Sequence, residues 1–323
     1  MIKKRFLSML VLLAAVVTGA VAQTTYKVSV KEGTEDATSW TIAPAEATTA
    51  GVAAGTTVTA TYSGTKKVKS VKAVKKAKPD LLSGVFSVSS TKKVKFSKGN
   101  LRYASGTWSF FDNQYDYYSS YNADAWDKFG WSTSATTYGM NTSTDKSTYS
   151  SNFVDWGSNS DLQTALGTGW FTLSSAESKY LFNTRSASTV GGTSNGRYAK
   201  AKVNNVLGVI LFPDTYTHPD GVTAPVGVNA GDATGWNGNN YSSADWTKME
   251  SAGCVFLPGA GYRSGSSVES PGIFGAYWSA TPNGAGNAYD FVYYYSGYLD
   301  PAFTNTRDHG FCVRLVQEVA PTY

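Results

Sequence analysis

The segment from 287 to 316, NAYDFVYYYSGYLDPAFTNTRDHGFCVRLV, brings Tyr, Phe, Asp, Asn and Ser together and contains no Lys, Glu, Gln, Trp or Met. Tyr supplies a large contact area at low entropy cost, and Asn, Asp and Ser supply adaptable hydrogen bonds. These residue types favour binding of a ligand over its chemical conversion. The candidate ligand-binding residues are Asp290, Tyr294, Tyr295, Tyr298, Asp300, Phe303, Asn305, Asp308 and His309.

The sequence contains no clear catalytic motif. It has only two histidines, His218 and His309, which excludes a metal centre with several His ligands. The sequence GTSNG at 192–196 has the spacing of a nucleophile elbow, but a strand rather than the required helix is expected to follow it, so it predicts a loop. No spacing of carboxylates selects an acid–base pair. We therefore expect no catalytic residue, no metal and no cofactor, and predict that the protein is not an enzyme.

Strand parity decides which side chains of the Tyr-rich segment face outward. If residues 288–295 form a strand with Phe291 inward, alternate residues share its face. The predicted inward set is Tyr289, Phe291 and Tyr293, and the outward set on the strand includes Asp290 and Tyr294. The following residues, up to 309, are expected to form a loop, where binding groups are commonly presented. The residues expected to serve packing are Trp278, Gly310, Val313, Arg314 and Leu315.

Further elements are expected to support this strand. The stretch 196–213 predicts a hairpin whose turn, Asn204-Asn205, tolerates positive φ. Ser174 followed by Glu177 is a capping box that predicts the start of a helix. A second short helix is expected to begin near Ser242 or Ser243 and to end at Gly253. Two helices with several antiparallel strands predict an α+β fold.

The N-terminus has the pattern of a signal peptide spanning residues 1–22. A basic segment at 3–5 precedes an apolar run at 6–17 and a small-residue cleavage site at 20–22. The apolar run is too short to span a bilayer, and no later stretch approaches the roughly 20 residues that a spanning helix needs. We therefore expect a secreted protein of the periplasm, cell surface or extracellular space, without a transmembrane span. A retained signal anchor is the alternative.

Composition and alternation predict two folded parts. Abundant Gly, Ser, Thr, Tyr and Asn with little Glu favour strands and long loops. The stretches TYKVSV and TTVTATY alternate in the strand period and predict a small β module at 23–65. A Lys-rich strand or linker at 66–83 follows, and 84–318 is predicted to be the main domain.

Charge is concentrated in one place. The formal net charge is +5, but seven lysines lie within 66–78, while residues 84–323 hold 16 Lys and Arg against 18 Asp and Glu. The main domain is therefore not expected to bind nucleic acid. The Lys tract either contacts an acidic envelope polymer or forms a solvated strand or linker.

Cys254 and Cys312 are far apart in sequence. In an exported chain they could form a disulfide across neighbouring strands, or they could remain free thiols, because sequence separation does not give their distance.

Six motifs occur in the same order as in a known family. They are FSVSSTKKVKFSKGNLRY (86–103), KYLFNTR (179–185), GVILFPD (208–214), VFLPGAGYR (255–263), YWSATPNG (277–284) and GFCVRLV (310–316). Over residues 84–318 the chain thereby resembles the Fibrobacter succinogenes major paralogous domain family. The resemblance implies a C-type-lectin-like domain with two main helices and long loops, in a secreted protein of gut bacteria. The Glu-Pro-Asn and Gln-Pro-Asp triplets of calcium-dependent lectins are absent, so calcium is not expected.

A compositional bias sharpens the functional expectation. Lys, Glu, Gln, Trp and Met make up 25 of the 195 residues from Gly84 to Trp278 but are absent from Ser279 to Val316, where about five would be expected. This bias resembles the variable region of a diversity-generating retroelement target protein, although chance avoidance in a Glu-poor, β-rich chain is the alternative. We expect an exported recognition protein that binds a protein or glycan on a cell surface. A structural cell-envelope or adhesin-tip subunit is the alternative, and the oligomeric state is not determined.

Overall fold

The computed structural model describes residues 80–319 continuously and, before them, the strand residues 8–11, 25–28, 31–32, 35–36, 40–43, 52–53, 58–62 and 73–75. The chain divides into two compact units, Met1–Lys78 and Pro79–Tyr323. Apart from 8–11, the predicted signal peptide lies outside the described residues. The same holds for the Lys tract at 66–78 apart from 73–75.

The first unit contains short strands in small sheets. Three strands pair in the order β1-β7-β5, three in the order β6-β2-β8, and β3 pairs with β4. The two alternating stretches of the sequence contain β2 and β7, which belong to different sheets. The bounds are β1 Ser8–Val11, β2 Thr25–Val28, β3 Lys31–Glu32, β4 Glu35–Asp36, β5 Trp40–Ala43, β6 Val52–Ala53, β7 Val58–Tyr62 and β8 Ala73–Lys75.

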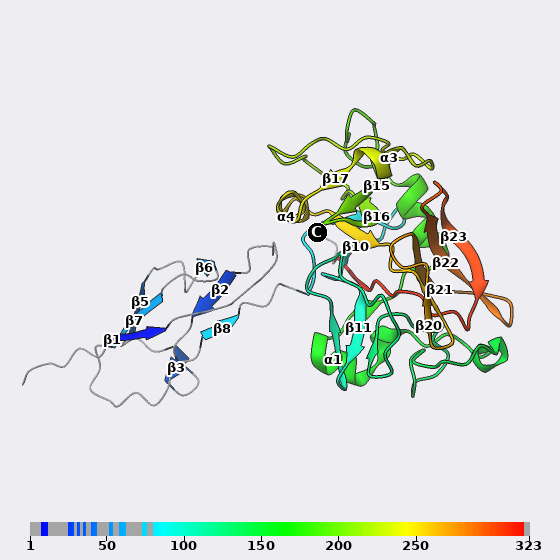
Figure 1. The fold of residues 1–323 in the computed structure, drawn as a ribbon, viewed down its shortest axis with the longest axis horizontal. Helices are drawn as coiled ribbons and strands as arrows, with labels where there is room; N and C mark the ends of the chain where they lie inside the picture. The colour runs from blue at the N-terminus through cyan, green and yellow to red at the C-terminus, as the bar shows by residue number, and fades with distance from the viewer. Residues whose placement is uncertain are drawn as a thin grey trace, which may run out of the picture. The chain divides into compact units, whose positions relative to one another are not determined.

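The second unit is built from several separate sheets (Figure 1). One sheet has the order β14-β24-β10-β9, and a second has the order β12-β11-β13. Their bounds are β9 Phe86–Ser87, β10 Lys93–Phe96, β11 Leu101–Ala104, β12 Thr107–Phe110, β13 Ala125–Trp126, β14 Trp170–Phe171 and β24 Val316–Glu318. Because β24 pairs with β10, the two ends of this unit meet in one sheet.

Three further sheets complete this unit. Their strand orders are β17-β15-β16-β18, β19-β20 and β21-β22-β23. The bounds are β15 Tyr198–Val203, β16 Val206–Leu211, β17 Asn240–Tyr241, β18 Val255–Pro258, β19 Tyr262–Ser264, β20 Ser267–Glu269, β21 Phe274–Asn283, β22 Asn287–Tyr294 and β23 Leu299–Thr306. The predicted hairpin at 196–213 is confirmed as β15 and β16, and its turn residues Asn204 and Asn205 have φ of 48° and 65°.

The helices are short. Their bounds are η2 Lys146–Tyr149, η3 Trp156–Ser158, α1 Ser160–Leu166, α2 Ser175–Lys179, η4 Tyr180–Thr184, α3 Thr234–Gly238 and α4 Ser243–Ser251. The capping box of Ser174 and Glu177 is confirmed at α2. A second capping box starts α4 at Ser242, and Gly253 follows that helix with a φ of 96°.

The prediction of an α+β, C-type-lectin-like fold is wrong. The part of the chain that the structure describes is mostly β, with 34% strand and 16% helix, and its strands are divided among several small sheets. The two expected helices exist, but α2 has five residues before it continues as the π-helical turn η4, and α4 has nine. A capping box determines where a helix starts and not how far it continues. Asn183 and Thr184 are the last residues of η4, and Gly253 comes two residues after the end of α4. All three are weak helix formers.

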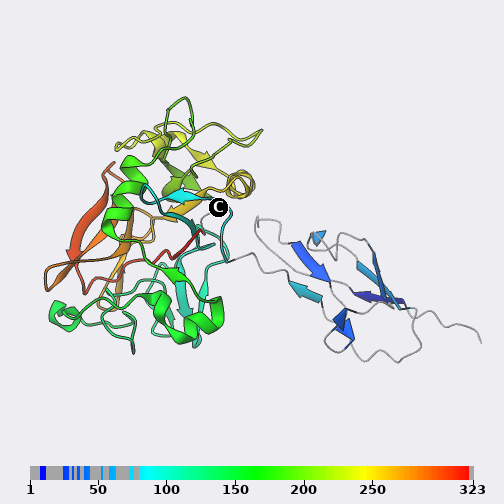
Figure 2. The ribbon, with the colours of Figure 1, turned by 180° about the vertical axis from the view of Figure 1, so that it is seen from behind.

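The sheet β21-β22-β23 lies between two hydrophobic clusters. Phe291 and Tyr293 of β22 belong to one cluster, whereas Ala288 and Val292 of the same strand belong to another. Both faces of the middle strand are therefore covered. Figures 1 and 2 show β23 on the outer side of this sheet, and it is one of the two edge strands.

Candidate functional site

The Tyr-rich segment forms a hairpin of two long strands, β22 and β23. The Tyr294 N–H donates to the Tyr298 carbonyl at 2.9 Å, and the Gly297 N–H donates to the Tyr294 carbonyl at 3.0 Å. Gly297 has a φ of 108°, and a Cβ there would lie 3.2 Å from the Ala233 nitrogen. A glycine is therefore required at this turn for both backbone conformation and space.

The expected loop from 295 to 309 is wrong for its central part, because residues 299–306 form strand β23. Its register opposite β22 shifts between Asp290 and Val292. Pro301 lies in this shifted region, and proline is tolerated in strands at edges and bulges. Pairing with β22 decides the outcome.

Asp290 is not exposed, which corrects a second prediction. Its side chain has no exposed surface, while Phe291 and Tyr293 are buried as predicted and Tyr289 is half-buried. Parity assigned Asp290 correctly to the face opposite Phe291, but exposure does not follow because both faces of β22 are covered. Across the sheet Asp290 pairs with Trp278 on β21 and with Phe303 on β23.

Large exposed side chains gather around the tip and edge of this hairpin. Within residues 80–319 six large hydrophobic side chains are exposed, and all but Val226 belong to this region. They form what we call the aromatic surface: Ile273 (51% exposed), Tyr294 (46%), Tyr295 (53%), Tyr298 (44%) and Phe303 (38%). The Tyr295 N–H donates to the Ile273 carbonyl at 2.9 Å, which joins the hairpin tip to the start of β21.

The rings of the aromatic surface contact one another and a buried support. The ring centres of Tyr294 and Tyr298 are 6.3 Å apart, and those of Tyr298 and Phe303 are 6.1 Å apart. The Tyr294 ring lies 4.4 Å from the ring of buried Phe274. The Tyr294 ring is thus held by packing on one side, and Tyr298 and Phe303 contact it in sequence.

Two carboxylates lie beside these rings. Asp300 Oδ2 accepts from the Tyr298 hydroxyl at 3.1 Å, and Asp300 Oδ1 accepts from the Ala302 N–H at 2.8 Å. Asn305 Nδ2 donates to Asp290 Oδ2 at 2.9 Å, whereas buried Asp290 Oδ1 has no hydrogen-bond partner among the described residues. Burial raises the pKa of Asp290 to about 8; the Asn305 hydrogen bond opposes this rise and the Asp300 charge adds to it. Asp290 is therefore mostly protonated at neutral pH.

Asp308 and His309 lie outside the aromatic surface, contrary to prediction. Asp308 is buried, and half-buried His309 packs with its ring centre 5.3 Å from Tyr262 and 5.9 Å from Phe311. Burial lowers the pKa of His309, and the Asp308 carboxylate opposes this shift. The chain turns inward after β23 because the buried guanidinium of Arg307 donates to several backbone carbonyls.

A buried lysine anchors the hairpin tip. Lys200 Nζ on β15 donates to the carbonyls of Gly231, Asp232 and Gly297. Three carbonyl oxygens satisfy the three donors of an ammonium group. This contact joins the tip to the loop at 231–232, and the sequence contained no signal for it beyond a lysine within an apolar strand.

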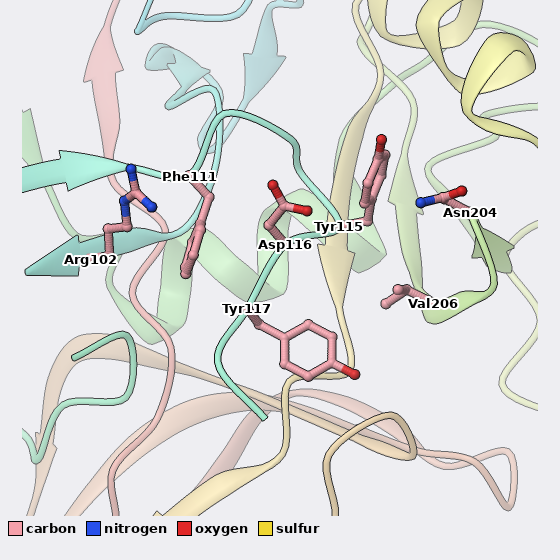
Figure 3. A pocket seen from close by; sticks show the side chains of 7 residues that line it. All are labelled: Arg102, Phe111, Tyr115, Asp116, Tyr117, Asn204 and Val206. Atoms are coloured by element: carbon pink, nitrogen blue, oxygen red, sulfur yellow. The ribbon is translucent and has the colours of Figure 1, made fainter. Parts of the chain in front are cut away.

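A second feature, which sequence reasoning missed, is an open pocket of about 370 Å³. We call it the loop pocket, and it is lined by Arg102, Phe111, Tyr115, Asp116, Tyr117, Asn204 and Val206. Figure 3 shows Arg102 and Phe111 on one side and Asn204 and Val206 on the other, with the segment from 115 to 117 between them. The dense aromatic and acidic residues of FFDNQYDYY (110–118) were the available sequence signal.

The walls of the loop pocket combine rings and opposite charges. The Arg102 guanidinium carbon lies 5.0 Å from the Phe111 ring centre. Asp116 Oδ2 accepts from the side-chain and backbone nitrogens of Asn113 at 3.0 and 3.3 Å. Burial raises the pKa of Asp116, against the lowering effect of these hydrogen bonds.

The structure also tests the predictions for the two cysteines, for the packing residues and for a membrane-spanning helix. Cys254 and Cys312 are buried free thiols, so they do not form the disulfide that the sequence left open. The residues expected to serve packing are buried: Trp278, Gly310, Val313, Arg314 and Leu315. Within the part of the chain that the structure describes, no helix combines the length and apolarity needed to cross a membrane.

No protein-family model, curated protein or solved structure matches this chain. The resemblance of six motifs to the paralogous domain family therefore stays a prediction.

Proposed function

We propose that this protein recognises a protein or glycan ligand through the aromatic surface. One observation carries the proposal: within residues 80–319, all but one of the exposed large hydrophobic side chains lie on the β22–β23 hairpin or at the adjoining Ile273. Single exposed hydrophobic residues are ordinary, whereas contiguous groups mark interaction sites. Tyrosine is also among the residue types that dominate binding energy at interfaces.

The support beneath the aromatic surface favours binding. Tyr294 packs on Phe274, and Lys200 holds the turn at Gly297. A surface that is already ordered loses less conformational entropy on binding. The tyrosine rings can therefore contribute contact area without first being ordered by the ligand.

Two sequence features support an exported and variable recognition protein. The leader at 1–22 favours display outside the cytoplasm, and the missing residue types between 279 and 316 favour a diversified segment. That segment includes Tyr294, Tyr295, Tyr298 and Phe303. Codon usage in this segment and a nearby template repeat with a reverse transcriptase would test the variable-region part of the proposal.

The binding test uses the mature chain on an array of glycans and cell-surface proteins. For a ligand found there, Tyr298→Ala is expected to remove about 2 kcal/mol of binding free energy if the ring is a hot spot. Val226→Ala is the matched control, because Val226 is similarly exposed but lies outside the aromatic surface. Equal losses in both variants, or unchanged binding by Tyr298→Ala and Tyr294→Ala, would contradict the proposal.

A structural subunit of an envelope or adhesin is the second candidate, and the exposed edge of β23 favours it. An edge strand can pair with a strand of another chain. Pro301 lacks an N–H and lies where the register shifts, and both features limit such pairing. Sedimentation of the mature chain separates the candidates: a stable assembly that protects Tyr295 and Tyr298 from chemical modification would favour the subunit.

A further inference from the structure

Several polar side-chain atoms of the loop pocket form no hydrogen bond with any described residue. Arg102 uses Nε to donate to the Ser109 hydroxyl at 2.9 Å, and its two outer nitrogens form no hydrogen bond with any described residue. The same is true of Asp116 Oδ1, the Asn204 side-chain amide and the hydroxyls of Tyr115 and Tyr117. The pocket thus offers both donors and acceptors to a ligand.

The charges of the pocket select the class of ligand. Arg102 and Asp116 carry opposite charges and both line the same space (Figure 3). An anion attracted by Arg102 is repelled by Asp116, and a cation experiences the reverse. A neutral ligand with many hydroxyl groups avoids both penalties and can donate to Asp116 while it accepts from Arg102 and Asn204.

The aromatic walls and the size of the pocket add to this selection. Three aromatic rings line the pocket beside the polar atoms: Tyr117 is half-buried, whereas Phe111 and Tyr115 are mostly buried in its wall. The apolar C–H face of a sugar ring complements such surfaces, and its hydroxyl rim complements the polar atoms. A volume of about 370 Å³ lies at the lower end of the range for ligand pockets, which suits one or two sugar rings.

The loop after β12 carries four of the lining residues, and buried hydrogen bonds hold it in place. Gln114 is fully buried; its Nε2 donates to Glu250 Oε1 at 2.8 Å and to the Cys254 carbonyl at 3.2 Å. Its Oε1 accepts from the Phe256 N–H at 2.7 Å and from Arg314 Nη2 at 3.0 Å. Four hydrogen bonds hold the residue next to Tyr115, so the pocket is ordered before a ligand arrives.

We propose that the loop pocket binds a neutral sugar residue, with Arg102, Asp116 and Asn204 bonded to its hydroxyl groups and Tyr117 against its ring face. This site is separate from the aromatic surface and does not depend on the function proposed for that surface. A protein that carries both would recognise a glycan and a second ligand independently.

The test is a titration of the mature chain, followed by NMR, with the methyl glycosides of glucose, galactose, mannose and N-acetylglucosamine. At least one of these is expected to shift signals of residues 102 and 111–117 saturably. Glucuronic acid, glucosamine and free glycine form the charged arm of the experiment, and each is expected to bind at least about tenfold more weakly. Preferred binding of any charged probe, or no saturable binding of all four glycosides, overturns the proposal.

Variants locate the site. Asp116→Asn and Arg102→Met are each expected to weaken glycoside binding about tenfold or more, since a hydrogen bond to a charged group contributes about 1.5–3 kcal/mol. Asn204→Gly tests the same site while preserving the turn, because glycine readily adopts positive φ. Val226→Ala is the matched control and is expected to leave glycoside binding unchanged, because exposed Val226 belongs neither to the loop pocket nor to the aromatic surface. Unchanged binding in all three pocket variants, with unchanged thermal melts, places the sugar elsewhere and overturns the proposal.

Discussion

The aromatic surface and the loop pocket are both rich in tyrosine, yet they differ in what holds their side chains. Sheet pairing positions the aromatic surface, and its rings remain exposed because β23 is an edge strand. Side-chain hydrogen bonds to Gln114 position the loop pocket, where rings alternate with charged groups. Similar residue types thus form an apolar contact area in one place and a polar, charge-balanced pocket in the other.

The largest expected effect separates the inside of the hairpin from its outside. Phe291 is buried and stacks on Phe182 with ring centres 4.3 Å apart. Phe291→Ala is expected to lower the free energy of unfolding by about 3–5 kcal/mol, as for other buried aromatics. Phe303→Ala on the exposed edge is the control for thermal or denaturant melts. A similar loss in both variants would remove the distinction between core and surface.

The second prediction concerns the support of the loop pocket. Gln114→Ala removes four hydrogen bonds from a buried site, three of them to the buried residues Cys254, Phe256 and Arg314, and is expected to cost about 2–3 kcal/mol of stability. Gln163→Ala is the control, because half-buried Gln163 donates a single side-chain hydrogen bond, to the Gly157 carbonyl. Denaturant melts measure both, and equal stability of the two variants would show that the network does not hold the loop.

The third prediction is a pH dependence of stability that comes from Asp290 in the hairpin. Burial raises the pKa of Asp290 to about 8, so the folded chain retains a proton that the unfolded chain releases near pH 4. The stability from this group is complete below about pH 4 and is lost as the pH rises to about 8, by up to about 1.4 kcal/mol per pH unit. Thermal melts from pH 4 to 9 should show a shallower decline for Asp290→Asn. An identical pH profile for both proteins would contradict the shifted pKa.

The smallest effect is expected at the aromatic surface itself. Tyr298→Ala removes an exposed ring whose hydroxyl donates to Asp300. The free energy of unfolding of this variant should differ from that of the unmodified protein by no more than about 0.5 kcal/mol, as for an uncoupled surface site. If Tyr298→Ala is destabilised as strongly as Phe291→Ala, the ring serves the fold and the surface loses its assigned role.

Local sequence signals predicted local structure well. The Asn204-Asn205 turn, the capping box at Ser174 and the glycine after α4 all have the expected conformation. Each depends on residues that are neighbours in the chain. Alternation also assigned Phe291 and Tyr293 to one face of β22, since parity is a property of any strand.

Predictions from local sequence patterns were wrong where a neighbouring strand or helix determined the burial or the secondary structure of a residue. Asp290 lies on the expected face but is buried, because Trp278 and Phe303 flank it from the neighbouring strands. Residues 299–306 form a strand despite Pro301, because β22 offers a partner. The expected helices begin correctly but stay short, and the sheets dominate the fold.

The sequence alone determined the turns, the helix starts, the strand parity and the concentration of tyrosine between 287 and 316. Only the tertiary structure decided which of those tyrosines are exposed, and only it joined Arg102, Asp116 and Asn204 into one pocket. The physical reason is the distance along the chain over which each interaction acts. Turn and capping preferences act over a few residues, whereas burial and pocket formation depend on contacts between segments about a hundred residues apart, such as 102–117 and 204–206.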